Sequence, residues 1–400
     1  MPEIHYPGVY VEETGAPPRA IAGVPTAVAA FVGFTVKGPR NRAVAVADYG
    51  EFVARFGAAA PGAVLPLAVR DFFANGGTAA VVVRCAGTRA GKAAAPTTGQ
   101  IVGTRRARTG LHALAAPTRF NLLCVPDAAR PLPGSARPDR RVDAAKIYAA
   151  AAALCAERRA ILLVDPPADC TTIEAALAWR QTLPRAAAAN AAAYWPRLRD
   201  AADPAGAPGR APSGAIAGVI ARTDAARGLW KAPAGPEATV AGTAGPTVSI
   251  DERGQGRLNA AAVNVIRHFG GRGVLVWGAR TLAGDDGGDP EFRYVPVRRL
   301  VLHVGESLAE GLKPAAFGCN GPALWARLRR AAEGFLMDLF RLGAFAGRSP
   351  REAFFARCDA TTTTQADIDA GRVHVEVGVA PLKPAEFVVI RLGIWTSCDA

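Results

Sequence analysis

Short apolar runs of strand length alternate with helix-like segments through the first half of the chain. Four runs have the continuous apolar character of strands that are buried on both faces: residues 26–35, 80–85, 120–125 and 161–164. The segments between them favour helices, at residues 49–56, 65–73, 143–157 and 173–182. This alternation predicts an α/β layer in which helices pack on a sheet.

Local signals set several of these boundaries. Asp48 stands near the start of the first helix, and Gly57 ends it. Thr172 is a suitable N-cap for the helix at residues 173–182. Residues 86–118 have little periodicity and are interpreted as a loop or small insert. Two Pro-, Gly- and Ala-rich stretches read as long surface connections, at residues 203–215 and 232–246, and the second is a candidate domain boundary.

The composition favours a folded, soluble chain. Of 400 residues, 50% are apolar and 20% are charged, which is enough apolar surface for sizeable cores. The longest apolar stretch, residues 27–36, is about half a membrane span, and the first residues lack the basic segment of a secretory signal. We therefore expect a soluble protein that is made without such a signal and does not insert into a membrane.

The last hundred residues show the clearest periodicity. Residues 294–311 should start as a strand and turn helical, and residues 323–342 should form an amphipathic helix. Its apolar face would carry Leu324, Leu328, Phe335, Leu336, Leu339 and Phe340. Its polar face would carry Arg327, Arg330 and Arg341, with Glu333 and Asp338.

Two alternating segments follow. Residues 373–379 place Val373, Val375, Val377 and Val379 on one face. Residues 386–395 place Val388, Ile390, Leu392 and Ile394 on one face. The two segments form either a hairpin or neighbouring strands. The first twenty residues read as an extended arm that contains β-formers around a Pro-Gly pair: Ile4, Tyr6, Pro7, Gly8, Val9, Tyr10 and Val11.

The charge balance leaves a second class of function open. The chain has 47 Lys and Arg against 34 Asp and Glu, a formal net charge of +13. A basic balance suits an acidic partner such as nucleic acid. The Arg-rich stretch at residues 105–108 lacks interleaved aromatic residues, which makes a solvated loop the better interpretation.

Motifs for catalysis, cofactors and metals are not recognisable. Residues 87–92 are one residue too short for a phosphate-binding loop, and the acidic residues at 285–289 lack the ligand spacing of a calcium loop. The seven cysteines form no C-x-x-C pair and read as reduced core thiols. We expect no cofactor and no metal. An enzyme with an unrecognised site remains the least favoured alternative.

Several runs together resemble the contractile tail sheath family, which comprises myophage tail sheaths and the sheaths of extracellular contractile injection systems. The most specific run is residues 212–235 (PSGAIAGVIARTDAARGLWKAPAG), followed by residues 258–282 (LNAAAVNVIRHFGGRGVLVWGARTL). Shorter runs agree in the same order: residues 6–13, 21–24, 27–33, 48–57, 72–77, 81–84, 294–300, 343–347 and 378–387, together with Asn320 and Trp325. The likeness spans nearly the whole chain. Larger members carry an additional domain where residues 86–118 lie.

The resemblance implies an α+β fold, with an α/β-layered body of mixed sheets and a C-terminal α/β polymerisation domain with extended N- and C-terminal β-arms. The expected division is an arm at residues 1–22, a body at 23–290 and a polymerisation domain at 291–400 that ends in an arm at 386–400. The resemblance also implies a non-enzymatic subunit that polymerises helically around an inner tube and contracts to drive the tube through a target envelope. Its partners would be further copies of itself, the tube protein, and baseplate and tail-terminator proteins, without nucleic acid.

Three hypotheses about residues follow. Both termini would be strands without a local partner, and the N-terminal β-formers and the C-terminal Val388, Ile390, Leu392 and Ile394 would act as inter-subunit arms. The strand with Val373, Val375, Val377 and Val379 would accept an arm from a neighbouring copy. Arg327, Arg330 and Arg341 would face the tube, or would be ordinary solvated or intra-sheath charges. The subunit would be cytoplasmic during assembly and then part of a phage virion or a released tail-like particle.

Overall fold

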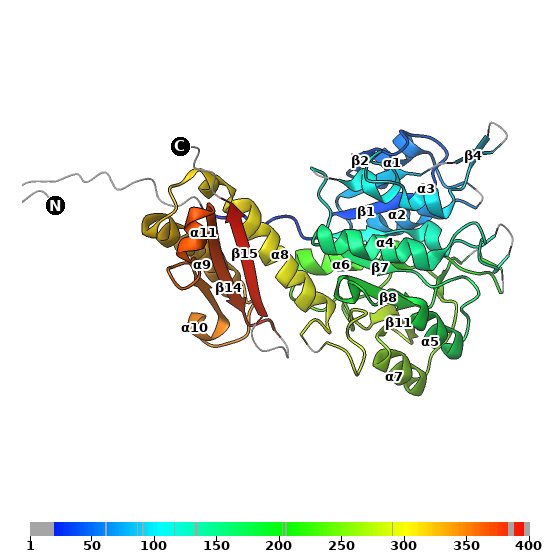
Figure 1. Cartoon of the computed structure of the whole chain (residues 1–400). Coiled ribbons are helices and arrows are strands. Elements are labelled where there is room, and N and C mark those ends of the chain that lie inside the picture. Colours follow the sequence, from blue (N-terminus) through cyan, green and yellow to red (C-terminus); the bar gives the residue numbers. More distant parts are fainter. Residues whose placement is uncertain are drawn as a thin grey trace, which may run out of the picture.

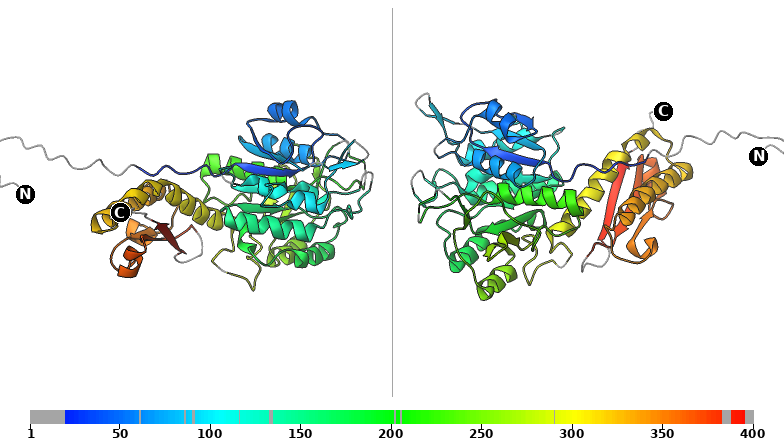
Figure 2. Two further views of the ribbon diagram at one scale, coloured as in Figure 1. Left: turned by 45° about the horizontal axis from the view of Figure 1, so that its top comes forward. Right: turned by 180° about the vertical axis from the view of Figure 1, so that it is seen from behind.

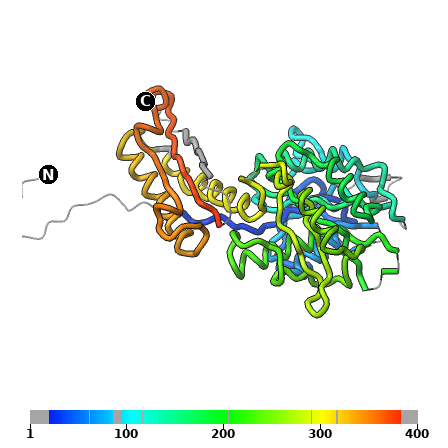
Figure 3. The backbone as a smooth tube through the Cα atoms, turned by 90° about the horizontal axis from the view of Figure 1, so that it is seen from below, coloured from blue at the N-terminus to red at the C-terminus, as the bar shows by residue number. Residues whose placement is uncertain are grey.

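The residues that the structure describes fold into two domains (Figure 1). The computed structural model describes residues 20–395 apart from residues 61, 86, 90–91, 116, 133–134, 202, 205, 290 and 383–387, and describes the backbone alone at 87–89, 92–93, 316–317 and 388–395. The large domain is built on an eight-stranded sheet and the small domain on a three-stranded sheet. Helix α8 (Val295–Gly311) and residues 20–28 pass between the two domains (Figures 2 and 3).

The large sheet has the strand order β12-β11-β8-β7-β6-β1-β3-β2. Its six inner strands are parallel, and the two edge strands, β12 and β2, are antiparallel to their neighbours. The strands are β1 (Ala29–Gly33), β2 (Ala43–Val46), β3 (Ala80–Arg84), β6 (Leu122–Cys124), β7 (Ile161–Val164), β8 (Ala191–Trp195), β11 (Val263–Phe269) and β12 (Gly273–Trp277). The α/β-layered body with mixed sheets is therefore confirmed.

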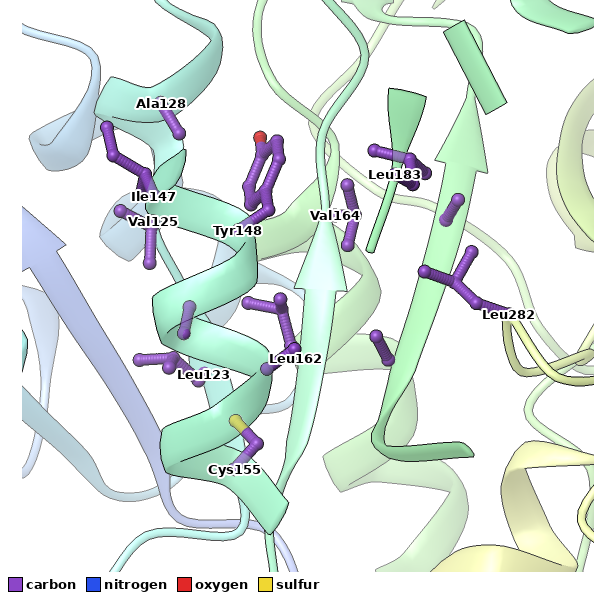
Figure 4. Packing of buried hydrophobic residues seen from close by; sticks show 14 of the residues in the cluster. Leu123, Val125, Ala128, Ile147, Tyr148, Cys155, Leu162, Val164, Leu183 and Leu282 are labelled. Atoms are coloured by element: carbon purple, nitrogen blue, oxygen red, sulfur yellow. The ribbon is translucent and has the colours of Figure 1, made fainter. Parts of the chain in front are cut away.

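Helices cover both faces of this sheet. Side chains of β7 alternate between two cores, with Leu162 and Val164 on one side and Ile161 and Leu163 on the other. Figure 4 shows the first of these cores, where Ile147, Tyr148 and Cys155 pack against the sheet. The helices of that side are α3 (Thr98–Val102), α4 (Ala144–Glu157) and α5 (Ile173–Thr182); those of the other are α1 (Tyr49–Phe56), α2 (Leu65–Ala74) and α6 (Ser213–Arg227).

Smaller elements complete the large domain. Helix α7 (Glu252–Ala260) lies beside α5 and β11. Two short antiparallel pairs are β4 (Gly87–Arg89) with β5 (Lys92–Ala94), and β9 (Leu198–Arg199) with β10 (Gly245–Pro246). The 3₁₀ turns are η1 (Gly110–Leu114), η2 (Pro126–Ala129), η3 (Ala188–Asn190) and, beyond this domain, η4 (Lys313–Phe317).

Caps explain why some predicted helices have the predicted bounds. Asp48 accepts the backbone N–H of Glu51 at 2.7 Å, and α1 covers the expected residues. Thr172 accepts the N–H of Ala175 at 3.1 Å, and α5 begins at Ile173 as expected. Each cap satisfies a backbone donor that the first helical turn leaves free.

Three expectations are corrected. Residues 86–118 are not a loop throughout, because α3 and η1 insert Ile101, Leu111 and Leu114 into the core with no exposed surface. Residues 203–215 are not only a connection, because α6 begins at Ser213. Residues 232–246 are no domain boundary: the backbone of Gly235, Ala238 and Val240 hydrogen-bonds the outer edge of β12 at 2.8–2.9 Å.

The small domain follows Tyr294. Helix α8 (Val295–Gly311) is helical from its first residue, so the expected initial strand is wrong; Pro296 fits its first turn, where no N–H is needed. The remaining elements are α9 (Pro322–Arg341), α10 (Pro350–Ala353), β13 (Phe354–Arg357), α11 (Gln365–Asp369), β14 (Arg372–Val379) and β15 (Val388–Trp395). Side chains of α8, α9, β13 and β14 share a third core.

Two glycines let α6 and α2 touch backbone to backbone. A Cβ on Gly214 would lie 2.0 Å from the carbonyl oxygen of Ala68, and one on Gly218 would lie 2.4 Å from that of Phe72. The run that most resembles the sheath family, residues 212–235, thus begins with a helix whose first nine residues are buried and whose small residues serve packing.

We predict that Gly214→Ala lowers the free energy of unfolding by about 1–3 kcal/mol or more, because the added methyl group forces two tightly packed helices apart. Gly256→Ala in α7 is the matched control, since a Cβ there meets nothing within 4 Å. It should be neutral or stabilise by up to about 1 kcal/mol. Thermal unfolding followed by circular dichroism measures both. Equal melting temperatures for the two variants would contradict the packing argument.

Candidate polymerisation site

Strand β14 is the centre of the small sheet, with β13 on one side and β15 on the other. The four alternating valines of β14 have no exposed surface and pack into the third core. The predicted alternation of β14 is therefore confirmed. The opposite face carries Phe355, whose ring lies where a Cβ on Gly378 would stand.

Strand β15 pairs with β14 of its own chain, antiparallel along the whole of β14. The four residues expected in the C-terminal arm are the Cα partners of the four valines: Val388 with Val379, Ile390 with Val377, Leu392 with Val375, and Ile394 with Val373. The hairpin interpretation is thus confirmed for the single chain. The expectation that the C-terminal strand has no local partner is therefore wrong. Its alternation matches that of β14, so it can complete the small sheet within its own chain.

The N-terminal β-formers, from Ile4 to Val11, lie outside the described residues. The described chain begins with residues 20–28, here called the strap, which runs along α8 from the small domain into the large one (Figure 3). Ile21 packs where a Cβ on Gly311 would stand, and the N–H of Val24 donates to Ser307 Oγ at 3.1 Å. Arg299 donates to the carbonyl of Thr26 at 2.9 Å. The chain thus enters the described structure at the domain that also holds β15.

The three predicted arginines of α9 lie on one exposed stripe. Arg327, Arg330 and Arg341 are all exposed, while the opposite face of the helix is buried in the third core. Asp338 lies on the same stripe and pairs with Arg341 at 3.3 Å. Leu342, which follows the helix, is 67% exposed, the highest value among the large apolar side chains described. The stripe is cationic with an apolar end.

A buried carboxylate lies at the place where sheets of this kind usually bind ligands. The strand order reverses between β1 and β6, and open α/β sheets bind ligands in the crevice at such a point. Here the buried Asp127 accepts the N–H of Phe34 at 2.8 Å and the guanidinium of Arg130 at 2.9 Å. A Cβ on Gly33 would lie 2.1 Å from the Asp127 carboxylate. This carboxylate ties the chain together where a substrate would need space.

A second buried carboxylate at the same edge is also structural. Asp165 accepts both the N–H and the hydroxyl of Ser213 at 2.7 Å, and so caps α6. Burial raises the pKa of Asp165 to about 6, against the opposing effect of those hydrogen bonds. Both of its oxygens are engaged, which argues against a role as a general acid or base.

Metal-like and cysteine features have plain structural explanations. In the acidic loop, Asp286 pairs with Arg280 at 2.9 Å and Asp285 lies 3.8 Å from Arg180. The described residues hold no group of three or more potential metal ligands. Five of the cysteines are buried free thiols and Cys319 is an exposed one, while Cys398 lies outside the described part of the chain. No described helix is long and apolar enough to span a membrane.

Comparison with known proteins agrees with this architecture. The family model for the phage tail sheath protein central domain matches residues 108–282. A tail sheath protein of Vibrio phage KVP40 is 24% identical over 189 residues, which are 47% of this chain and 27% of the relative. This chain thus aligns with about a quarter of that relative's length.

Solved structures match over nearly the whole chain. The sheath complex of an extracellular contractile injection system, PVC, in its contracted state is 28% identical, with a TM-score of 0.73 over 98% of both chains. The contracted helical sheath of the anti-feeding prophage is 28% identical, with a TM-score of 0.72 over 96% of this chain and 98% of that one. A sheath tail protein from Listeria innocua, at 9% identity and a TM-score of 0.61 over 94% of this chain and 97% of that one, shares the fold.

These matches define a class of structural sheath proteins. This chain is similar to contractile tail sheath proteins, through the family model over its central part and through solved sheath structures over nearly its whole length. Sequence reasoning missed the strap contacts, since backbone groups make most of them. Residues 21–24 gave a signal only through the family resemblance.

We predict that Ser307→Ala loosens the strap. The change leaves the N–H of Val24 without its buried acceptor, at a cost of about 1–3 kcal/mol. Hydrogen exchange of residues 20–28 should therefore speed up, while residues 144–157 of the large domain should exchange as before. Thr223→Ala is the control, because that hydroxyl bonds only within α6. Unchanged protection of the strap in Ser307→Ala would contradict its anchoring role.

Proposed function

We propose that this chain is a sheath subunit that polymerises helically around an inner tube and contracts to drive that tube through a target envelope. The observation that carries the proposal is the convergence of the strap and β15 on the small domain. Arms that leave from one domain can link neighbouring copies without distorting the large domain. The relatives that form a sheath complex and a helical sheath in the contracted state support it.

In this proposal, residues 1–22 form the N-terminal arm, residues 23–290 the body and residues 291–400 the polymerisation domain. The partners are further copies of this chain, the tube protein, and baseplate and tail-terminator proteins. A sequence identity of 28% to a chain of the anti-feeding prophage baseplate structure supports the baseplate contact. Neither nucleic acid nor membrane insertion has a part. The subunit assembles in the cytoplasm and leaves it within the particle.

The arms would join copies by strand exchange. In the polymer, β15 of one copy replaces the β15 of its neighbour beside β14, and the N-terminal β-formers add to a sheet edge. Exchange of an identical element repeats the hydrogen bonds of the single chain, so it needs no new surface. A contact between unlike surfaces that does not close into a ring generates a helix of subunits.

We predict that deleting residues 1–18, or ending the chain at Glu386, gives a protein that forms no sheath. The large domain should keep near-native secondary structure in both variants. Replacing Ile390 by Asp should weaken assembly more gently. Negative-stain microscopy and circular dichroism make the test. Normal tubes from either truncated protein would show that assembly depends on the globular faces alone.

The exposed arginine stripe of α9 would face an acidic tube. Each exposed ion pair contributes less than about 1 kcal/mol, but many repeated copies add up, and such contacts release easily. We predict that Arg327→Glu with Arg330→Glu weakens co-sedimentation with the tube protein and leaves the fold intact. Arg351→Glu, an exposed charge of the small domain outside α9, is the control. If the doubly substituted sheath still co-sedimented normally with the tube protein, the proposal that this stripe faces the tube would be wrong.

The subunit would act without catalysis. The energy of contraction would be stored in packing between subunits, with a kinetic barrier that holds the extended form. The buried Asp127 carboxylate, which lies 2.1 Å from where a Cβ on Gly33 would stand, supports this view, because it ties the chain together at the point where open α/β sheets usually bind ligands. We predict that purified particles contract in the presence of chelators and without nucleotide, and that mild acid or denaturant triggers them. A requirement for added ATP would refute the prediction.

A further inference from the structure

His303 lies in the middle of α8, where the two domains and the strap meet. Its ring centre is 6.2 Å from that of Phe335 in α9. A Cβ on Gly23 of the strap would lie 3.3 Å from the ring atoms Cε1 and Nε2. The imidazole is thus packed between α9 of the small domain and the strap, on the helix that both domains share.

The surroundings of the His303 imidazole favour its neutral form. Its Nδ1 is buried and has no hydrogen-bond partner among the described residues. The cavity beside it has a volume of about 20 Å³. That is space for about one water molecule, so a hydrated counter-ion would not fit. Protonation makes both ring nitrogens donors, and the buried Nδ1–H would then face no acceptor.

The charged groups around the ring cannot compensate a proton. Arg299, one turn earlier in α8, forms a two-pronged ion pair with Asp224 of α6 at 2.6 and 2.7 Å. Glu306, further along α8, pairs with Arg159 at 2.7 Å. Both nearby carboxylates therefore already have partners. The strap has no ionisable side chain, and Phe335 is the ring that α9 places against the imidazole.

We propose that His303 is a pH-sensitive latch, which holds the strap against α8 while the imidazole is neutral and releases it when the imidazole is protonated. The latch is a property of the single chain and does not depend on the proposed function. Within a sheath, it would couple acidification to the N-terminal arm, because the strap is the segment through which that arm reaches the body.

The direction of the effect follows from proton linkage. Burial, and then the charge of Arg299, lower the pKa of His303 from 6.5 to about 4. The released state, with an ordinary pKa, binds a proton more readily than the latched state. The latch is therefore fully effective above pH 6.5 and weakens as the pH falls toward 4. At pH 5, these two pKa values correspond to a shift of about 30-fold toward release.

Hydrogen exchange of residues 20–28 in the full chain tests the latch at pH 7 and pH 5, with intrinsic rates corrected by an unstructured peptide. His303→Phe keeps an aromatic ring beside Phe335 but cannot titrate, and His303→Gln serves if that variant does not fold. Between pH 7 and pH 5, the protection of the wild-type strap should fall by about 20-fold more than that of either variant.

His268→Phe is the matched control, since His268 is exposed on β11. It should respond to acid as the wild type does. If the wild type and the His303 variants lose the same protection between pH 7 and pH 5, the latch does not exist. The same holds if the loss occurs equally in residues 144–157, because acid would then loosen the whole molecule.

Discussion

Helix α8 belongs to two hydrophobic cores at once, and this sharing holds the molecule together. Val295 and Leu302 pack with the large domain, whereas Leu300, Val304 and Leu308 pack with the small one. If the two domains rotated relative to each other, α8 could follow only one of them. The rotation would therefore expose apolar surface of α8 at the other core. The strap is a second connection along the same helix. The two domains are therefore built to move as one body.

This rigidity limits where contraction can take place. If the joint within each subunit stays closed, movement has to come from the contacts between subunits. Arms that attach to the small domain fit this requirement, because they can remain docked while whole bodies rotate. A latch at His303 would add a controlled exception, since it lies on the joint itself and bears on the strap.

The sequence predicted the elements that carry strong local signals and missed those without them. The helices α1 and α5 have capping side chains, and β1, β3, β6 and β7 are continuous apolar runs. Helix α6 was missed because residues 213–221 are all buried, so it shows no contrast between an apolar and a polar face. Strand β8 was missed because three alanines carry little strand propensity.

The candidate polymerisation site was predictable in part for the same reason. Alternation placed the four valines of β14 and the arginine stripe of α9 on the correct faces. Whether β15 pairs with its own chain or with another has no signal in the sequence, because the register is identical in both cases. The strap is held through the backbone of residues 24 and 26, which no side-chain pattern reports.

The most direct test of strand exchange is to determine whether β15 in the assembled sheath pairs with β14 of its own chain or with β14 of a neighbouring chain. His374 and Gly393 are Cα partners across β14 and β15. His374→Cys with Gly393→Cys, in a chain with Cys319→Ser and Cys398→Ser, should form a disulfide within each chain in the monomer. Oxidised sheaths should instead give a ladder of covalently linked chains on a denaturing gel. Monomer bands alone from oxidised sheaths, with the disulfide formed, would contradict the exchange of β15.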